Sequence, residues 1–310
     1  MKERIVFMGT PVFACAILKC LKEADYDVVL VVSQPDKKVG RKQLIQETPV
    51  KALAQTYGIE VFQPERIKDT YEQILRYRPD LIVTCAYGQM IPEALLHAPR
   101  HGSINVHASL LPKLRGGAPI HKAIINGDSQ SGISIMRMVK QMDAGAVMKQ
   151  VAVAITQDDT MGTLSEKLAD AGGKLLLECL PLILRDEAVF IEQDESQATF
   201  AYNISKEEEK IDFTRPLQNV YDQIRGLIPS PIGYAFLNGK KIKFHAVRKK
   251  EQAHAHQNGE LVGMMEGALA IACEGGYLLV EELQMEGKAK LDAKSFYNGA
   301  GRNLIGSCIV

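Results

Sequence analysis

The chain has 310 residues, which exceeds the usual length of one domain and favours two. It is 46% hydrophobic and 24% charged, which is typical of a folded globular protein and excludes a disordered or fibrous one. Because 37 basic residues balance 37 acidic ones, no overall field attracts nucleic acid, and any such binding must come from local patches.

Cysteine usage and the amino-terminal sequence indicate the compartment. The six cysteines form no CxxC pair, and no histidine lies at metal-ligand spacing, so we expect reduced thiols and no metal site. Met1-Lys-Glu-Arg4 leads straight into a strand-like run without a signal peptide. Nothing approaches the ~18 apolar residues of a membrane span. These features predict a soluble, cytoplasmic protein that is not bound to a membrane.

The first elements alternate between strand and helix patterns. An apolar run over Arg4–Met8 ends in Gly9-Thr10-Pro11, and apolar residues then recur at helical spacing over Val12–Leu21. Val28–Val32 and Leu81–Thr84 are continuous apolar runs, as expected for parallel strands covered on both faces. This alternation predicts an α/β fold with a doubly wound, mostly parallel sheet. The glycine turn lacks the full GxGxxG fingerprint, so we predict no dinucleotide site.

The remaining elements of the first domain follow in order. A helical stretch covers Tyr71–Tyr77, and Ile104–Val106 is a further strand. Ile133–Met138 and Met148–Ile155 have β patterns, and Thr163–Leu184 has the pattern of a long helix that would close the domain.

The last third of the chain has a different pattern. A polar stretch from Glu192 to Lys210 suggests a connection between domains. After a helical pattern at Val220–Leu227, alternating β segments separated by Asn-Gly and Gly-Gly turns predict a small β-barrel; they cover Gly233–Leu237, Lys241–Val247, Gly267–Ala272 and Tyr277–Leu283. We therefore predict a catalytic domain over residues 1–189, a linker over 190–205 and a C-terminal barrel over 206–310.

Three polar side chains lie at or beyond the carboxyl end of the predicted strand Ile104–Val106. The run Asn105-Val-His107-Ala-Ser109-Leu-Leu-Pro112-Lys-Leu-Arg115-Gly116-Gly117 supplies an amide and an imidazole, and Met142-Asp143-Ala-Gly145 supplies a carboxylate. Open α/β sheets bind ligands at the carboxyl ends of their strands. A lone Asn or His there more often stabilises a turn, but acyl transfer could use all three groups together.

These motifs resemble the methionyl-tRNA formyltransferase family of folate-dependent formyltransferases, and the resemblance runs end to end. It also rests on Phe7-Met-Gly-Thr-Pro11, Gln34-Pro-Asp36, Gly40-Arg41, Ala86-Tyr-Gly88, Ile91-Pro92, Ser205-Lys-Glu-Glu208 and Gly226-Leu-Ile-Pro229-Ser-Pro231. It implies a Rossmann-like domain followed by an OB-like β-barrel. It also implies transfer of the formyl group of 10-formyltetrahydrofolate to the amino group of methionyl initiator tRNA, a step of translation initiation in protein biosynthesis.

The resemblance also implies roles for individual residues. Asn105, His107 and Asp143 would be catalytic, and the tetrahydrofolate site would be lined by Ser109, Leu110, Leu111, Pro112 and Met90. We hypothesise that Asn105 and His107 donate to the formyl oxygen, because residues two apart in a strand share a face. Asp143 would move the proton from the attacking amine towards N10 of the folate. The chain departs from the family pattern at Leu114 and His121.

Two basic regions stand out on this neutral chain. Between Gln34 and Lys51, five basic residues outnumber two acidic ones, an excess of three. A charge run of this size is ordinarily a solvated loop. The resemblance instead implies that the loop reaches the acceptor end of the tRNA through Arg41, Lys42, Lys37 and Lys38, with Arg41 at the key position. Lys240-Lys241-Lys243 and Arg248-Lys249-Lys250 would form a phosphate track.

Other functions share parts of this pattern. A formyltransferase acting on an amino-sugar nucleotide would carry the same three polar residues and the same Ser109–Pro112 segment. A glycinamide ribonucleotide formyltransferase should end near the first domain, and hydrolysis of formylfolate is a variant of the same site. A catalytically inactive tRNA-binding module is the alternative from another class. The family resemblance further implies a monomer.

Overall fold

The computed structural model describes residues 2–39 and 43–310. The chain forms two compact units. The N-terminal unit comprises residues 1–119, 130–154 and 165–202, and the C-terminal unit comprises residues 120–129, 155–164 and 203–310. The predicted division is linear, whereas two short segments from the middle of the chain belong to the C-terminal unit.

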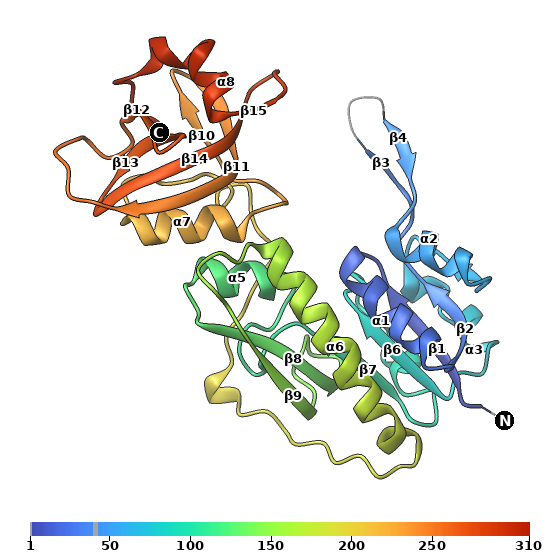
Figure 1. Ribbon diagram of the computed structural model, residues 1–310. Helices are drawn as coiled ribbons and strands as arrows, with labels where there is room; N and C mark the ends of the chain where they lie inside the picture. The colour runs from blue at the N-terminus through green and yellow to red at the C-terminus, as the bar shows by residue number, and fades with distance from the viewer. Residues whose placement is uncertain (1, 40–42) are drawn as a thin grey trace. The chain divides into compact units, whose positions relative to one another are not determined.

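The N-terminal unit contains a sheet with the strand order β5-β2-β1-β6-β7-β8-β9 (Figure 1). Its strands are β1 (Arg4–Gly9), β2 (Asp27–Val32), β5 (Val61–Phe62), β6 (Leu81–Cys85), β7 (Ser103–His107), β8 (Gln130–Arg137) and β9 (Val147–Ala154). The strands from β5 to β7 pair in parallel, and β8 and β9 continue the sheet in antiparallel orientation. The predicted Rossmann-like, mostly parallel sheet is confirmed.

Helices cover both faces of this sheet, which explains why its inner strands are continuously apolar. They are α1 (Val12–Glu23), α2 (Pro49–Thr56), α3 (Glu72–Leu75), α4 (Glu93–Leu96) and most of α6 (Met161–Leu184). In α6, a Cβ on Gly172 would lie 3.2 Å from Val106 Cγ1, and a Cβ on Gly173 would overlap Cys20 Sγ of α1. Two glycines inside this helix therefore allow close packing on α1 and β7.

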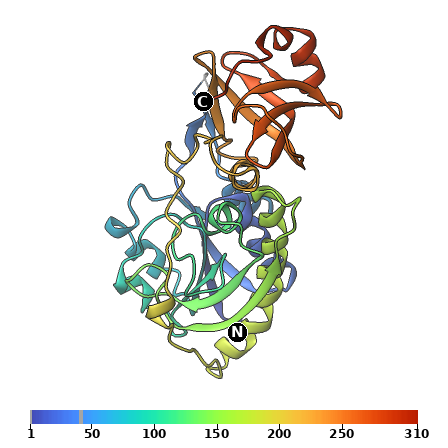
Figure 2. The same cartoon turned by 90° about the vertical axis from the view of Figure 1, so that its left-hand side faces the viewer.

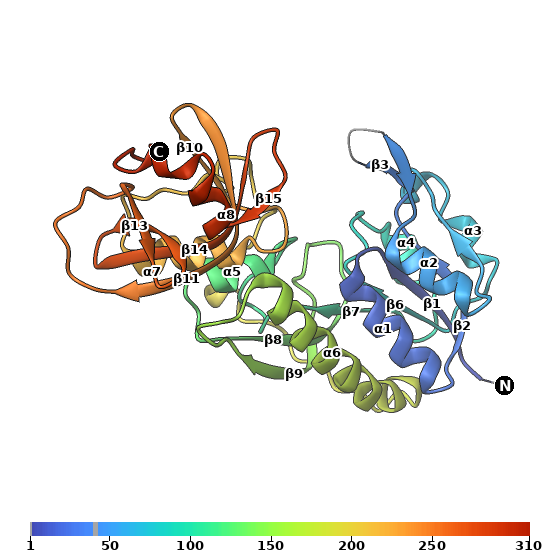
Figure 3. The same ribbon diagram turned by 45° about the horizontal axis from the view of Figure 1, so that its top comes forward.

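The sequence patterns miss or misplace several short elements. The predicted helix at Tyr71–Tyr77 is only the single turn of α3. The segment treated as a basic loop contains the hairpin β3 (Lys37–Val39) and β4 (Leu44–Gln46), which stands out from the body of the N-terminal unit (Figure 3). α2 follows, with Thr48 as its N-cap accepting from the Lys51 amide.

The C-terminal unit contains an antiparallel sheet with the order β10-β11-β14-β13-β12, and β15 pairs with β14. The strands are β10 (Tyr234–Leu237), β11 (Lys240–Glu251), β12 (Leu261–Met265), β13 (Ala268–Cys273), β14 (Gly276–Met285) and β15 (Lys290–Asp292). α5 (Pro119–Ile125), α7 (Leu217–Gly226) and α8 (Ala293–Asn298) accompany them. The predicted strand-rich C-terminal domain is confirmed.

The last residues of the chain join the two edges of this sheet. Ile309 bridges Leu237 of β10, and Cys308 bridges Glu260 beside β12. Val310 and Phe236 exchange backbone hydrogen bonds of 2.7 and 2.9 Å. The Ile309 side chain is 2% exposed and belongs to the core of the unit. Residues 307–310 thus turn the open strand order into a closed barrel, in which neither β10 nor β12 is a free edge.

We predict that Ile309→Ala lowers the free energy of unfolding of the C-terminal unit by about 2–4 kcal/mol, because it leaves a cavity at the closure of the barrel. Val310→Ala is the matched control, since that side chain is 65% exposed and its pairing uses only the backbone. Urea unfolding followed by circular dichroism measures both. Equal stabilities of the two variants would contradict the closing role of Ile309.

Candidate active site

β7 presents Asn105 and His107 on one side of the sheet, because they are two residues apart in an extended strand. Asn105 pairs with Thr84 of β6 and with Met136 of β8, so the strand is held on both edges. His107 is buried, and Asn105 is half-buried. Both side chains are therefore fixed by regular sheet structure rather than by a loop.

The loop between β8 and β9 brings Asp143 to these two residues. Asp143 Oδ1 lies 3.4 Å from Asn105 Nδ2 and 3.6 Å from His107 Nδ1. Its other oxygen, Oδ2, accepts a 2.8 Å hydrogen bond from the Gly116 amide. The Asp143 backbone is in the left-handed region, with φ of +50°. The structure thus brings together all three residues that the sequence predicts to be catalytic.

Partners outside the trio set the orientation of the two donors. The Leu114 carbonyl lies 3.1 Å from His107 Nε2 and can only accept, so Nε2 carries a hydrogen and Nδ1 faces Asp143. The Thr84 hydroxyl donates to Asn105 Oδ1 at 2.9 Å, which leaves the Asn105 amino group for Asp143. Sequence patterns did not single out Thr84, because a threonine inside a β-branched strand carries no distinguishing signal.

This arrangement has the polar groups that acyl transfer requires. The Asn105 amide and a protonated His107 Nδ1 converge on one point, which in this structure is occupied by a carboxylate oxygen, and could stabilise an oxyanion there. Asp143 is only 15% exposed, so its interactions with these neighbours are weakly screened by solvent. The carboxylate could also accept and return a proton.

Comparisons with known proteins assign the family. Residues 3–180 match the formyl transferase model, and residues 203–301 match the formyl transferase C-terminal domain model. A methionyl-tRNA formyltransferase of Geobacillus sp. (strain WCH70) is 46% identical over 97% of this chain and 96% of that protein. One from Macrococcus caseolyticus (strain JCSC5402) is 48% identical over 98% of each chain. The chain belongs to the methionyl-tRNA formyltransferase family.

Solved structures of more distant proteins share the fold. An N-formyltransferase from Helicobacter canadensis, in complex with folinic acid and dTDP-3-aminofucose, has a TM-score of 0.65 at 19% identity, with 90% of this chain and 98% of that chain covered. HypX from Aquifex aeolicus in complex with tetrahydrofolic acid has a TM-score of 0.70 at 15% identity. That match covers 96% of this chain but spans about half of HypX, at 47%.

The predicted folate residues of this formyltransferase differ in accessibility. Ser109 is buried, and its hydroxyl donates to the Lys113 carbonyl at 2.6 Å. Leu111 is also buried, with its carbonyl accepting from Gln150 at 2.9 Å. Leu110 and Pro112 are half-buried. Ser109 and Leu111 therefore shape the loop from within, and Leu110 and Pro112 are its more accessible members.

The remaining predicted folate residue lies after β6. Met90 is 65% exposed. The side chain of the neighbouring Gln89 is held in place, because its Oε1 accepts a 2.8 Å hydrogen bond from the Ile67 amide. An exposed methionine offers a polarisable apolar contact for a ring system. Met90 is therefore available for a ligand in a way that the buried Ser109 is not.

The basic region of the formyltransferase is partly neutralised. Lys51 pairs with Asp36 at 2.5 Å and with Glu47 at 3.1 Å. Hydrogen bonds from Gln63 and Lys51 hold the pKa of Asp36 below its usual value. Lys51 therefore stabilises its own segment through these two ion pairs and is not available to bind an anion.

The other predicted basic residues divide into two groups. Lys37 and Lys38 lie exposed on β3 and make no ion pair within residues 2–39 and 43–310. Arg41 and Lys42 lie outside the described residues. Leu44 and Ile45 of β4, 66% and 70% exposed, accompany the lysines on the hairpin.

The predicted phosphate track in the C-terminal unit is divided as well. Arg248 pairs with Glu266 at 2.8 Å, and Lys250 pairs with the same carboxylate at 2.6 Å. By contrast, Lys240 and Lys243 have neither an ion pair nor a hydrogen bond to their side chains in the part of the chain that the structure describes. The available charge therefore lies at the start of β11 and not at its end.

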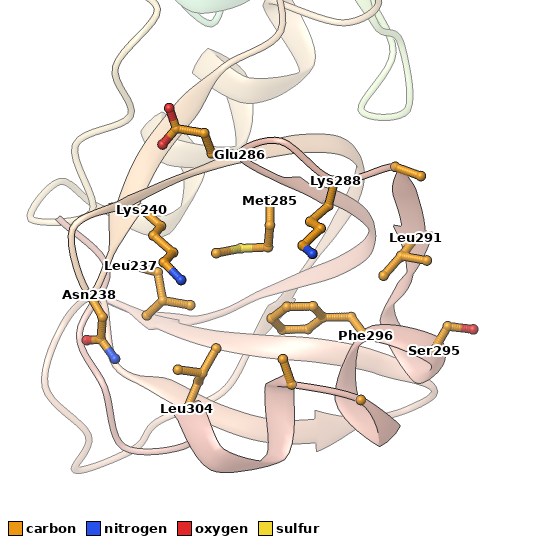
Figure 4. A pocket seen from close by; sticks show the side chains of 13 residues that line it. Leu237, Asn238, Lys240, Met285, Glu286, Lys288, Leu291, Ser295, Phe296 and Leu304 are labelled. Carbon is orange, nitrogen blue, oxygen red and sulfur yellow. The ribbon is translucent and has the colours of Figure 1, made fainter.

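Lys240 also borders a cavity of about 930 Å³ in the same unit. Leu237, Met285 and Phe296 are among the apolar side chains that line it. Figure 4 shows Lys240 and Lys288 reaching over this apolar lining, while the Glu286 carboxylate points away. The cavity lies wholly within the barrel unit and contains none of the predicted catalytic residues.

The described residues offer neither a cluster of metal-binding side chains nor a membrane-spanning helix. Among them, no group of three or more His, Cys, Asp or Glu side chains is placed to hold a metal ion. All six cysteines are free thiols, and burial raises the pKa of Cys179 to about 11. In residues 2–39 and 43–310, no helix is both long and apolar enough to cross a bilayer.

We predict that Thr84→Val lowers the formyl-transfer rate constant about tenfold, because Asn105 loses the ~1.4 kcal/mol that one hydrogen bond contributes to its orientation. Thr84→Ser keeps the hydroxyl, so its formyl-transfer rate constant should fall far less. Single-turnover kinetics with saturating substrates measure both. Equal rates for the Val and Ser variants would show that Thr84 does not orient the amide.

Proposed function

We propose that this chain transfers the formyl group of 10-formyltetrahydrofolate to the free amino group of methionyl initiator tRNA. The observation that carries the proposal is the approach of Asp143 Oδ1 to both Asn105 Nδ2 and His107 Nδ1, at 3.4 and 3.6 Å. Full-length similarity to methionyl-tRNA formyltransferases supports the choice of acceptor. The reaction serves translation initiation.

The proposed mechanism assigns one role to each of these residues. The amine nitrogen attacks the formyl carbon, and the carbonyl π electrons move to oxygen. Asn105 Nδ2 and a protonated His107 Nδ1 donate hydrogen bonds to this oxyanion. Asp143 accepts the proton of the amine and passes it to N10, so that the bond from carbon to N10 breaks and the carbonyl forms again. Donor and acceptor exchange one formyl group for one proton.

The folate is proposed to lie between the two segments that follow β7 and β6. Leu110 and Pro112 on one side and the exposed Met90 on the other offer apolar contacts for its rings. Ser109 and Leu111 hold the first segment in shape through bonds to Lys113 and Gln150. The chemistry of this co-substrate requires N10 to come within reach of Asp143.

The RNA is proposed to bind through basic side chains of the hairpin and of the barrel unit. Lys37 and Lys38 on the hairpin would contact its acceptor end together with Arg41 and Lys42. Lys240, Lys243 and Lys288 would add phosphate contacts from the barrel unit. We further propose catalysis by residues 1–189, RNA binding by 206–310 across the linker 190–205, and action as a cytoplasmic monomer without a metal ion.

An amino-sugar nucleotide is the competing acceptor. The Helicobacter canadensis enzyme shares the fold but is only 19% identical, so it supports the architecture and not the substrate. Transfer of labelled formyl to methionyl initiator tRNA, methionyl elongator tRNA and an amino-sugar nucleotide tests the proposal directly. We expect strong preference for the initiator. Preferred transfer to the sugar would overturn the RNA assignment, and no transfer to any acceptor would favour a binding module.

Asp143→Asn should lower kcat about 100-fold or more while both substrates still bind, because an amide keeps the shape of the side chain but cannot relay the proton. Steady-state kinetics and equilibrium binding of a non-reactive folate measure the two properties separately. A variant with near-normal turnover would remove Asp143 from the mechanism.

Arg41→Ala should lower kcat/KM for initiator tRNA about 10- to 100-fold and leave folate binding unchanged, because one guanidinium fork contributes ~1–3 kcal/mol to recognition. Arg41→Lys keeps the charge but not the planar guanidinium, so its kcat/KM for initiator tRNA should lie between those of the wild type and of Arg41→Ala. Unchanged kinetics with the alanine variant would refute the contact.

A further inference from the structure

The guanidinium of Arg115 is completely buried beside the candidate active site. A buried charge is tolerated only when it is paired and its hydrogen bonds are made. Arg115 Nη1 and Nη2 donate to the two carboxylate oxygens of Glu195 at 2.9 and 2.7 Å. Hydrogen bonds from Arg115 lower the pKa of Glu195, so the carboxylate remains ionised at neutral pH. The Arg115 side chain is thus buried and held by ionic hydrogen bonds, while the Glu195 side chain is 62% exposed.

Arg115 also orients the side chain of Gln193. Gln193 Oε1 accepts from Arg115 Nε at 3.1 Å and from Nη2 at 2.8 Å. Because a guanidinium can only donate, the Gln193 amide oxygen must face Arg115, and its amino group must face the opposite way. The orientation of this amide is therefore decided by its neighbour.

The amino group of Gln193 holds the loop that carries Asp143. Nε2 donates to the Asp143 carbonyl at 2.8 Å and to the Gly145 carbonyl at 2.7 Å. The Asp143 backbone is in the left-handed region, with φ of +50°, and these two hydrogen bonds hold it in that conformation. Gln193 thus fixes the backbone of the residue whose carboxylate reaches Asn105.

The carboxylate of Asp143 is held by the residue that follows Arg115 in the chain. Its Oδ2 accepts from the amide of Gly116, the residue that follows Arg115. The Arg115 backbone pairs with residues 199–201, since its amide donates to the Thr199 carbonyl at 2.9 Å and its carbonyl accepts from Ala201 at 2.7 Å. Figure 2 shows this stretch of chain running along the N-terminal unit. Backbone and carboxylate of Asp143 are therefore both tied to the segment 193–201.

We propose that Gln193, oriented by Arg115, is a positioning residue for Asp143. It touches no reacting atom. It sets the position and orientation of the Asp143 carboxylate relative to Asn105 and His107. It therefore affects the proton transfer rather than substrate binding. The inference rests on the proposed function, since it takes formyl transfer through Asp143 as the reaction. It gives the segment predicted as a linker a positioning role within the N-terminal unit.

Gln193→Glu tests this role sharply. The substitution keeps the size of the side chain and its acceptor oxygen for Arg115, but it turns a carboxylate oxygen towards two backbone carbonyls. We expect kcat to fall about 10- to 100-fold, as displacement of a catalytic group by about 1 Å does. The KM values for folate and tRNA should stay within twofold of the wild type. Gln193→Ala, which removes the donor without adding a charge, should show a smaller loss in the same direction.

Gln73→Glu is the matched control, because it makes the same chemical change at an exposed position of α3, outside the segment 193–201. It should leave kcat unchanged. The deciding measurement combines Gln193→Glu with Asp143→Asn. If Gln193 acts through the Asp143 carboxylate, it should cause no further loss once that carboxylate is gone.

The outcomes separate this inference from the proposed function. Active wild type, impaired Asp143→Asn and non-additive loss in the double variant would support the inference. It is overturned if Gln193→Glu and Gln193→Ala both match the wild type, if the two losses multiply, or if KM rises together with a lowered melting temperature. A wild-type chain that formylates no acceptor would overturn the proposed function and the inference with it.

Discussion

The hydrogen bond from the Gly116 amide to Asp143 Oδ2, 2.8 Å long, joins the two loops that carry the site. One loop follows β7 and the other connects β8 to β9. The Gly116 backbone has φ of +121°, and a Cβ there would lie 2.7 Å from the Ala201 carbonyl oxygen. Only glycine therefore fits the position from which this amide donates. Without this bond, the Asp143 carboxylate would lose its link to the loop after β7.

Orientation in the site is set by partners that can act in only one way. A carbonyl accepts and a guanidinium donates, so each fixes the amide or ring that it contacts. Leu114 fixes the His107 ring in this manner, and Arg115 fixes the Gln193 amide. Both partners lie in the loop over residues 112–118. A single loop thus orients groups on both sides of Asp143, which preorganises the site before any substrate binds.

The basic side chains of the described residues divide into those paired with a nearby carboxylate and those without one. On a chain with 37 basic and 37 acidic residues, many basic side chains are neutralised locally. Lys51 forms an ion pair with Asp36, and Arg248 forms one with Glu266. Lys38 and Lys240 are left without acidic partners among the described residues, and such side chains are the ones on which electrostatic attraction of an RNA would depend. Counting charges along a segment overestimates the charge that is free to act.

The sequence by itself determined the alternation of strands and helices, the strand-rich C-terminal part and the trio of Asn105, His107 and Asp143. Apolar periodicity and short motifs are local properties, so they can be recognised without a structure. Only the tertiary structure decided that residues 307–310 close the barrel, that Thr84 orients Asn105, and that Gln193 supports Asp143. These contacts join residues far apart in the chain. Gln193 in a polar stretch has no local signal of its role, because that role comes from the partners that folding places around it.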